Sequence, residues 1–254
     1  MNYRVAFLTI LRKEIYRFMR IWPQTLLPVA VTTSLYFLIF GRMMGERIGR
    51  MGGFNYIDFI VPGVVLMAVI NNSYSNVVSS FYSTKFQHYI EELLVAPVPD
   101  WIILAGYVCG GVARGLAVGC VVTVISMLFS DVRIQHWPVA LGVFVLTATL
   151  FSLAGFINAM FANSFDDISI VPNFVLTPLV YLGGVFFTVD MLPGVWRGVS
   201  LANPILYMIN AFRYGFLGIS DIPVLQAMAV ASGFIVVLAG ASLLLLRKGV
   251  GIKN

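Results

Sequence analysis

The sequence predicts an all-α protein that crosses a membrane several times as a single domain over residues 1–254, and three observations predict this. Of the 254 residues, 59% are hydrophobic and 11% are charged, whereas about a quarter of a soluble domain is charged. The mean hydropathy is +0.92. Several apolar runs also reach the roughly 20 residues that a helix needs to cross a bilayer. A soluble protein of this composition would expose large apolar patches, so that class is excluded.

The apolar runs place the spanning helices. We expect six of them, at about residues 22–40, 57–81, 101–129, 137–162, 168–187 and 223–246. An even number of spans puts both chain ends on the same side of the membrane. Basic residues gather at those ends, at Arg4, Arg12, Lys13, Arg17, Arg20, Arg247, Lys248 and Lys253. Because cytoplasmic loops accumulate Lys and Arg, we expect both termini in the cytoplasm.

Residues 3–20 form an amphipathic pattern at helical spacing. Leu8, Leu11, Ile15, Phe18 and Trp22 fall on one side of the helix, and Lys13, Arg17 and Arg20 fall opposite. This pattern is typical of a helix that lies in the membrane interface with its basic face toward anionic headgroups. The alternative is a positive flank that only orients the first span.

The longest polar interruption in the first half of the chain lies at residues 85–99, after the second span. Phe86, Ile90, Leu93 and Leu94 share a helical face, Glu91 and Glu92 are adjacent acids, and Pro97 and Pro99 end the helix. A helix that only crossed water would not need an apolar face. We therefore predict a cytoplasmic docking helix within residues 82–99.

The connection at residues 188–222 is too apolar for a free loop and too interrupted by proline and glycine for a span. We expect short helices that dip back into the outer leaflet, shielded by the spans.

The sequence argues against catalysis by this chain. A P-loop needs Gly-x4-Gly-Lys-Ser/Thr, and none of the four lysines is followed by Ser or Thr. The two histidines, His88 and His136, fall on opposite sides of the membrane in the predicted topology, so they cannot form one site. His88 could pair with Glu92 on the surface of the docking helix. We expect no bound metal and no catalytic residue.

The third predicted span combines a glycine repeat with a charge. Gly111, Gly115 and Gly119 make one smooth face, which suits close helix packing either inside the bundle or between subunits. Arg114 lies about 20 Å along the helix from Trp101, near mid-membrane. Burying it is costly, so it either pairs with a polar residue of a neighbouring helix or acts in a transport path or gate.

The second predicted span carries amides and hydroxyls, among them Asn72 and Asn76. Such groups are costly to expose to lipid, so they face other helices or a water-filled route. Aromatic residues of the fifth span, Tyr181, Phe186 and Phe187, could stack on sugars near an outer gate or form the usual interfacial belt.

Two stretches carry a family resemblance. One runs from Glu91 to Val98. The other runs from Leu176 through Gly183-Gly184 to Asn203-Pro204-Ile205-Leu206-Tyr207 and Arg213. With the six-span layout and the basic N-terminal helix, the chain resembles the permease subunits of type-2 ABC exporters, and among them most the YadH/NodJ type inner-membrane permeases.

The resemblance implies a homodimer in the bacterial inner membrane, bound to two copies of a separate ATP-binding subunit that holds ATP and Mg. It implies that the helix after the second span is a coupling helix seated on that subunit, and that the loop at Asp166 and Asp167 is a second contact. Residues 188–222 would close the outer gate. We expect export of an amphipathic, lipid-linked or saccharide substrate, with no ATPase activity outside the complex.

The candidate residues follow from these patterns. Those for docking are Phe86, Ile90, Glu91, Glu92, Leu93, Pro97, Asp166 and Asp167. Those for the transport path and gate are Asn72, Asn76, Arg114, Tyr181, Phe186, Phe187, Tyr207 and Arg213. Two other functions remain open: a channel or carrier that works without ATP, and a membrane-embedded enzyme acting on lipids. The first needs paired ionisable residues inside spans, and the second needs converging acids, histidines or a metal set.

Overall fold

The computed structural model describes residues 3–251, apart from the side chain of Leu94, and confirms the all-α prediction. Lys253 lies outside the described residues. Within them, the helices long and apolar enough to cross a membrane are Trp22–Ile48, Tyr56–Phe86, Asp100–Ser126, Trp137–Phe161 and Val224–Lys248. These five correspond to the first, second, third, fourth and sixth predicted spans.

The fifth predicted span, 168–187, forms a shorter helix over Asp167–Leu182. It consists of α8 (Asp167–Val171), a π-helical segment (Pro172–Leu176) and α9 (Thr177–Leu182). The helix ends earlier than predicted because Gly184, with φ of +79°, turns the chain. At 1.5 Å per residue the helix covers about 24 Å, against about 30 Å of hydrocarbon, so the count of six spans stays a prediction.

The first spanning helix is longer than the predicted 22–40. It runs through α2 (Trp22–Tyr36), a π-helical segment (Phe37–Met44) and α3 (Gly45–Ile48). Gly41 lies inside this helix and packs against Ile57 so closely that a β-carbon would lie 2.6 Å from Ile57 Cδ1. A hairpin of β1 (Arg50–Met51) and β2 (Phe54–Asn55), paired antiparallel, then leads into the next span.

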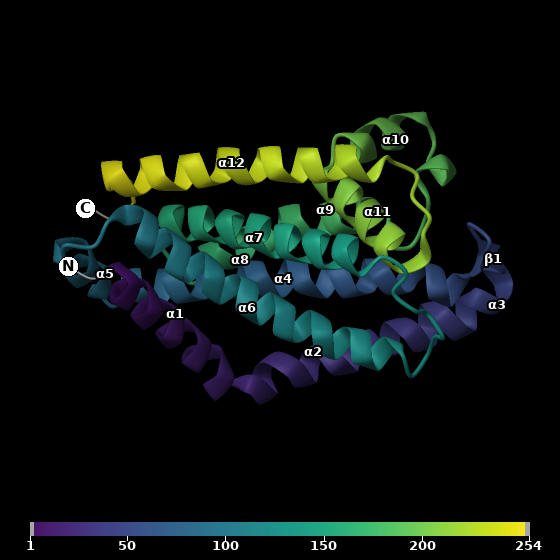
Figure 1. Cartoon of the computed structure of the whole chain (residues 1–254), viewed down its shortest axis with the longest axis horizontal. Helices are drawn as coiled ribbons and strands as arrows, with labels where there is room; N and C mark the ends of the chain where they lie inside the picture. Colours follow the sequence, from purple (N-terminus) through teal and green to yellow (C-terminus); the bar gives the residue numbers. More distant parts are fainter. Residues whose placement is uncertain (1–2, 252–254) are drawn as a thin grey trace.

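The second spanning helix, α4 (Tyr56–Phe86), is the centre of the bundle, and most of its side chains are buried. It packs against α6 (Asp100–Ser126) and α7 (Trp137–Phe161). α12 (Val224–Lys248) lies on the outside of α7, as Figure 1 shows, and few of its side chains are buried. A helix that is apolar all round and largely unburied suits contact with lipid.

The predicted connection at 188–222 forms a short 3₁₀ turn (Val189–Met191), α10 (Gly194–Leu201) and α11 (Pro204–Leu217). The Asn203 side chain caps α11 by accepting a hydrogen bond from the Ile205 amide at 3.0 Å. α11 is largely buried and packs on α4, α7 and α12.

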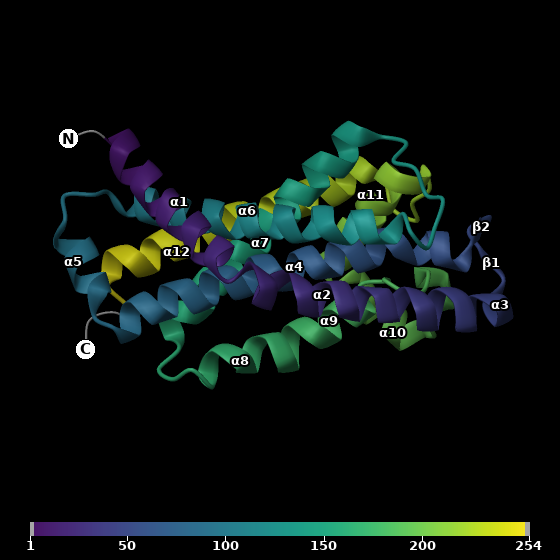
Figure 2. The same cartoon turned by 90° about the horizontal axis from the view of Figure 1, so that it is seen from below.

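The two ends of the bundle differ. The start of α1 (Tyr3–Arg20), α5 (Tyr89–Val95) and the end of α12 gather at one end, which we name the α5 end. The β hairpin, α3 and α10 lie at the other, the α10 end (Figures 1 and 2). α1 crosses α6 obliquely, as Figure 2 shows, and the polypeptide changes direction between α1 and α2.

Candidate functional site

The predicted docking helix is split in two by a sharp corner. α4 continues to Phe86, and α5 begins only at Tyr89. Between them His88 has φ of +60°, in the left-handed region, which a continuous right-handed helix cannot contain. The prediction of one helix over 82–99 is therefore wrong, and Phe86 belongs to the end of α4.

The corner turns the predicted apolar face inward. Ile90 is only 2% exposed and belongs to the protein's own core. Leu93 is half-buried and lines a cavity beneath α1. Because the Ile90 side chain is buried in its own chain, the prediction that it fills a partner's cleft is wrong, whereas for the half-exposed Leu93 it stays a prediction.

The acidic side chains of α5, and two residues beside this helix, remain exposed on the surface of the chain. Glu91, Glu92 and Pro97 are exposed, and Phe86 is 59% exposed. His88 Nδ1 lies 3.1 Å from Glu91 Oε1, so the predicted pairing of His88 with Glu92 is also wrong. Glu92 makes no side-chain hydrogen bond or ion pair among those found in the described part of the chain.

The loop at residues 163–167 meets this corner. The ring of Phe165 packs edge-on against Tyr82 and Phe86, with centroid distances of 4.9 and 5.1 Å. Lys85 Nζ donates to the carbonyl oxygens of Met160 and Ala162 at 3.0 and 2.7 Å, and so ties the end of α4 to the end of α7. The two predicted docking regions therefore form one surface. We name the exposed side chains Phe86, Glu91, Glu92, Phe165 and Asp166 the docking surface.

The two aspartates of the loop differ. Asp167 Oδ2 accepts hydrogen bonds from the amides of Asn163 and Ser164 at 2.9 and 3.1 Å, and its own amide donates to Ser164 Oγ at 3.1 Å. This reciprocal arrangement is a capping box at the start of α8. The amide of Asn163, and then Ser164, lower the pKa of Asp167 below its ordinary value. Asp167 thus orders the loop, and Asp166 is the exposed acid.

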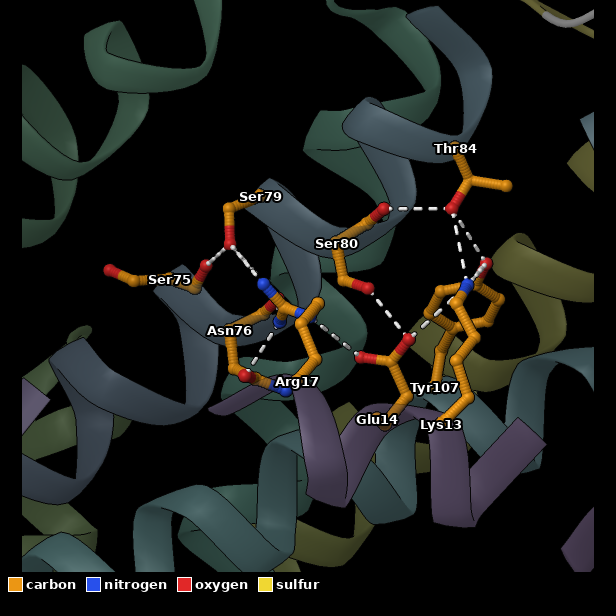
Figure 3. A network of polar contacts seen from close by, with 9 residues as sticks. All are labelled: Lys13, Glu14, Arg17, Ser75, Asn76, Ser79, Ser80, Thr84 and Tyr107. Atoms are coloured by element: carbon orange, nitrogen blue, oxygen red, sulfur yellow. Dashed lines mark hydrogen bonds and ion pairs between the residues drawn. The ribbon is translucent and has the colours of Figure 1, made fainter. Parts of the chain in front are cut away.

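A network of ion pairs and hydrogen bonds around the buried Glu14 joins α1 to α4, as Figure 3 shows. Glu14 is fully buried and accepts a hydrogen bond from Ser80 Oγ at 2.6 Å. It pairs with Lys13 Nζ at 3.6 Å and Arg17 Nε at 3.5 Å. Lys13 also donates to the Tyr107 hydroxyl of α6 at 3.2 Å. The network fixes the position of α1 on the bundle.

The network engages the predicted polar face of α4. Arg17 Nη2 donates to Asn76 Oδ1 at 2.7 Å (Figure 3), so the expectation that Arg17 faces lipid headgroups is wrong. Four residues earlier, Asn72 Oδ1 lies 3.4 Å from Arg114 Nη2. Arg114 therefore has the polar partner that the sequence left as one of two possibilities. Its role in gating stays a prediction.

The glycine face of α6 is packed inside the bundle. A β-carbon at Gly111 would overlap Ser152 and Val77, one at Gly115 would overlap Ser73, and one at Gly119 would overlap Phe144. All of these neighbours lie on α4 or α7. Of the two possibilities, internal packing or a subunit interface, the structure supports internal packing.

At the α10 end, Arg213 is buried and holds the turn that follows α9. Its Nη2 donates to the Gly184 carbonyl at 2.6 Å, and its guanidinium lies 3.9 Å from the ring centroid of Phe59. Tyr56 donates to the Phe186 carbonyl of the same turn at 3.1 Å.

Tyr207 donates to the Leu201 carbonyl at 2.9 Å. Arg213 and Tyr207 were predicted as path residues, but these contacts give them positioning roles, because their polar groups bind backbone.

Four aromatic residues gather beside that turn. Phe186 packs with Phe40 at 4.8 Å between ring centroids, with Tyr36 at 5.8 Å and with Tyr181 at 6.0 Å. The Tyr36 and Tyr181 hydroxyls lie 3.0 Å apart. We name these four the aromatic cluster. Phe187 is half-buried and makes none of these ring contacts.

The structure thus places the predicted residues in three regions. The docking surface lies near α5, and Asn72, Asn76 and Arg114 lie where α1 and α6 contact α4. Tyr181 and Phe186 belong to the aromatic cluster, toward the α10 end (Figure 2). Sequence reasoning missed Glu14, Tyr107 and Phe165. Glu14 carried a signal, since it is the one acid in residues 3–20 and has basic residues one before and three after it. Within the described residues, no three His, Cys, Asp or Glu side chains come close enough to hold a metal.

Comparisons with known proteins agree with this arrangement. Residues 5–217 match the family described as ABC-2 type transporter. The chain is 56% identical to proteins named inner membrane transport permease YadH in Escherichia coli strain K12 and in Shigella flexneri, over 99% of this chain and 98% of theirs. It is 25% identical to nodulation protein J of Rhizobium leguminosarum bv. trifolii, over 84% of this chain and 82% of that protein.

Proposed function

The chain belongs to the ABC-2 type transporter family, and on that premise we propose that this transport permease is the membrane subunit of an ATP-driven exporter in the bacterial inner membrane. ATP and Mg would bind to a separate ATP-binding subunit, since the sequence holds no P-loop of its own. The family and the relatives' names support transport rather than catalysis by this chain.

The docking surface is the observation that carries the proposal. It joins two segments that are about 75 residues apart in the sequence, and it combines exposed aromatic rings with acids that have few or no partners. Exposed aromatic side chains are enriched at protein interfaces. Glu91, Glu92 and Asp166 would set the register against basic residues of the ATP-binding subunit. The inward-facing Ile90 would couple movement of α5 to α4.

The α5 end also indicates how the chain is oriented in the membrane. The start of α1, which carries Arg4, lies with α5 and the basic end of α12 (Arg247 and Lys248) at the α5 end (Figure 1). We assign that end to the cytoplasm, because Lys and Arg concentrate on the cytoplasmic side of membrane proteins. The aromatic cluster would then face the outer half of the membrane, where it could stack on the rings of a saccharide or lipid-linked substrate. Two copies of the chain, each with an ATP-binding subunit, would form the complete exporter.

Co-purification tests the proposal. The chain would be expressed with the products of neighbouring open reading frames, extracted in mild detergent and isolated through an affinity tag. We expect a P-loop protein to co-purify, and its ATPase activity to change when the permease is bound. If no P-loop protein binds and none responds to the permease, the exporter assignment fails, and a carrier that works without ATP becomes the better account.

A further inference from the structure

An apolar groove of about 290 Å³ lies between α6 and α7. Residues of both helices line it at helical spacing: Cys120, Thr123 and Val124 from α6, with Met127 just after it, and Trp137, Ala140, Leu141 and Phe144 from α7. Phe212 and Phe216 of α11 form its floor. Val124, Met127, Trp137 and Leu141 are all more than half exposed, so the groove is open at the surface of the bundle.

The lining of the groove is apolar and is therefore suited to binding a hydrocarbon chain. Its one hydroxyl, that of Thr123, is already bonded to the Gly119 carbonyl at 2.7 Å. An engineered apolar cavity of about 150 Å³ binds benzene, so this volume fits about a dozen carbons. The residues from Cys120 to Met127 cover about 10 Å along the helix axis, which matches part of one extended acyl chain.

The groove lies between two helices that cross the membrane, so lipid surrounds it. α6 and α7 are both long and apolar enough to span a membrane. Trp137 begins α7 and is exposed, as is typical of tryptophans at the membrane interface. An acyl chain in the groove would therefore have its headgroup beside the loop at residues 127–136. Because lipid tails are as apolar as the groove, selectivity for a particular lipid must come from the headgroup.

A polar cavity of about 390 Å³ adjoins the groove at that level. Phe216 is a wall of both, and the consecutive residues Ile134 and Gln135 line one each. Asp58, Asp131 and Arg133 line the polar cavity. Ser130 donates to Asp58 at 2.5 Å, whereas Asp131 and Arg133 are exposed. The cavity thus offers two carboxylates and one guanidinium.

From this juxtaposition we infer that the chain binds a zwitterionic phospholipid with a primary ammonium, of the phosphatidylethanolamine class. One acyl chain fills the groove, the ammonium lies at Asp131 and Asp58, and the phosphate lies at Arg133. A purely anionic headgroup would meet two carboxylates. A trimethylammonium headgroup has no N–H to donate. The inference goes beyond the proposed function and does not rest on it.

Brominated lipids test the site through Trp137. The chain has four tryptophans, so a variant with Trp22→Phe, Trp101→Phe and Trp196→Phe keeps Trp137 as its one indole. The matched control keeps Trp196 instead, which lies on α10 and is also about half exposed. Each would be reconstituted in bilayers that contain brominated phosphatidylethanolamine, phosphatidylcholine or phosphatidylglycerol with identical chains, and quenching gives relative binding constants.

We expect phosphatidylethanolamine to be preferred at Trp137 by about five-fold over the other two lipids, with no preference at Trp196. Asp131→Asn or Arg133→Gln should remove the preference, and neither exposed change should disturb the fold. Val124→Phe should also remove it by filling the groove, whereas Val236→Phe on the exposed side of α12 should not.

Two results would overturn the inference. One is equal quenching of Trp137 by the three lipids, which would make the occupant an ordinary surrounding lipid. The other is a phosphatidylethanolamine preference that survives both Asp131→Asn and Arg133→Gln, because the side chains of the polar cavity would then not determine which headgroup binds.

Discussion

The ring of Phe86, at the end of α4, packs edge-on against the ring of Phe165, in the loop before α8, with 5.1 Å between their centroids. The contact unites the two segments of the docking surface, although neither ring is buried. It makes the position of the loop depend on α4, which runs through the whole bundle. A movement imposed on this surface would therefore reach α4 directly.

The first prediction concerns that contact. Phe165→Ala should remove the edge-to-face contacts with Tyr82 and Phe86, which are worth about 0.5–1.5 kcal/mol each, and weaken binding of the ATP-binding subunit. The yield of co-purified subunit measures the effect. Phe174→Ala is the control, since Phe174 is exposed on the helix Asp167–Leu182 away from this contact. Equal losses in the two variants would show that the loop takes no specific part.

The second prediction concerns the buried network. Glu14→Ala should leave Arg17 and Lys13 without their carboxylate and should lower the stability of the detergent-solubilised chain by about 2–4 kcal/mol. Glu14→Gln should cost less, because its amide oxygen can still accept the hydrogen bond from Ser80. Thermal unfolding followed by size-exclusion chromatography measures this. Glu46→Gln, at an exposed acid, should change nothing, and an equal midpoint for Glu14→Ala and Glu46→Gln would contradict the network's structural role.

The third prediction concerns the contact of α4 with α7. A β-carbon at Gly155 would lie 2.6 Å from the Tyr74 carbonyl oxygen, and backbone cannot move aside cheaply. Gly155→Ala should therefore destabilise the bundle by about 1–3 kcal/mol. Gly233→Ala on α12 has open space around it and serves as the control. If both variants melt at the same temperature, the close approach of α4 and α7 is wrong.

The fourth prediction concerns pH. The pKa of Asp167 is lowered in the folded chain by the amide of Asn163 and by Ser164. Its carboxylate therefore stabilises the fold above the ordinary aspartate pKa of about 3.9, and the contribution is lost as the pH falls through the lower folded value. Melting temperatures of the wild type and Asp167→Asn should differ at pH 7. The difference should begin to shrink below about pH 4 and vanish below the lower folded pKa. Asp166→Asn should follow the wild type throughout, and a gap for Asp167→Asn that persists at low pH would contradict the capping role.

The sequence predicted the helical class and most spans, because each rests on a long apolar run that no single residue can hide. It predicted the family from the two motif stretches at 91–98 and 176–213. The predicted bounds of the docking helix are wrong because the left-handed turn falls at His88. A glycine at that position would have marked the turn in the sequence, and a histidine does not. The sequence also assigned the apolar face of α5 to a partner, since periodicity shows that a face is apolar without showing what covers it. The contacts of Glu14 with Ser80 and of Phe86 with Phe165 join residues that are 66 and 79 positions apart, which no local pattern could reveal.

The most direct test of the central claim, that the α5 end docks an ATP-binding subunit, is the affinity of that purified subunit for the reconstituted chain. We would compare the wild type, the double variant Glu91→Lys and Glu92→Lys, and Glu46→Lys, which changes an exposed acid in α3. The account predicts that the double variant binds at least about ten-fold more weakly, that its membrane fold is intact, and that Glu46→Lys binds like the wild type. Wild-type affinity in the double variant would contradict it.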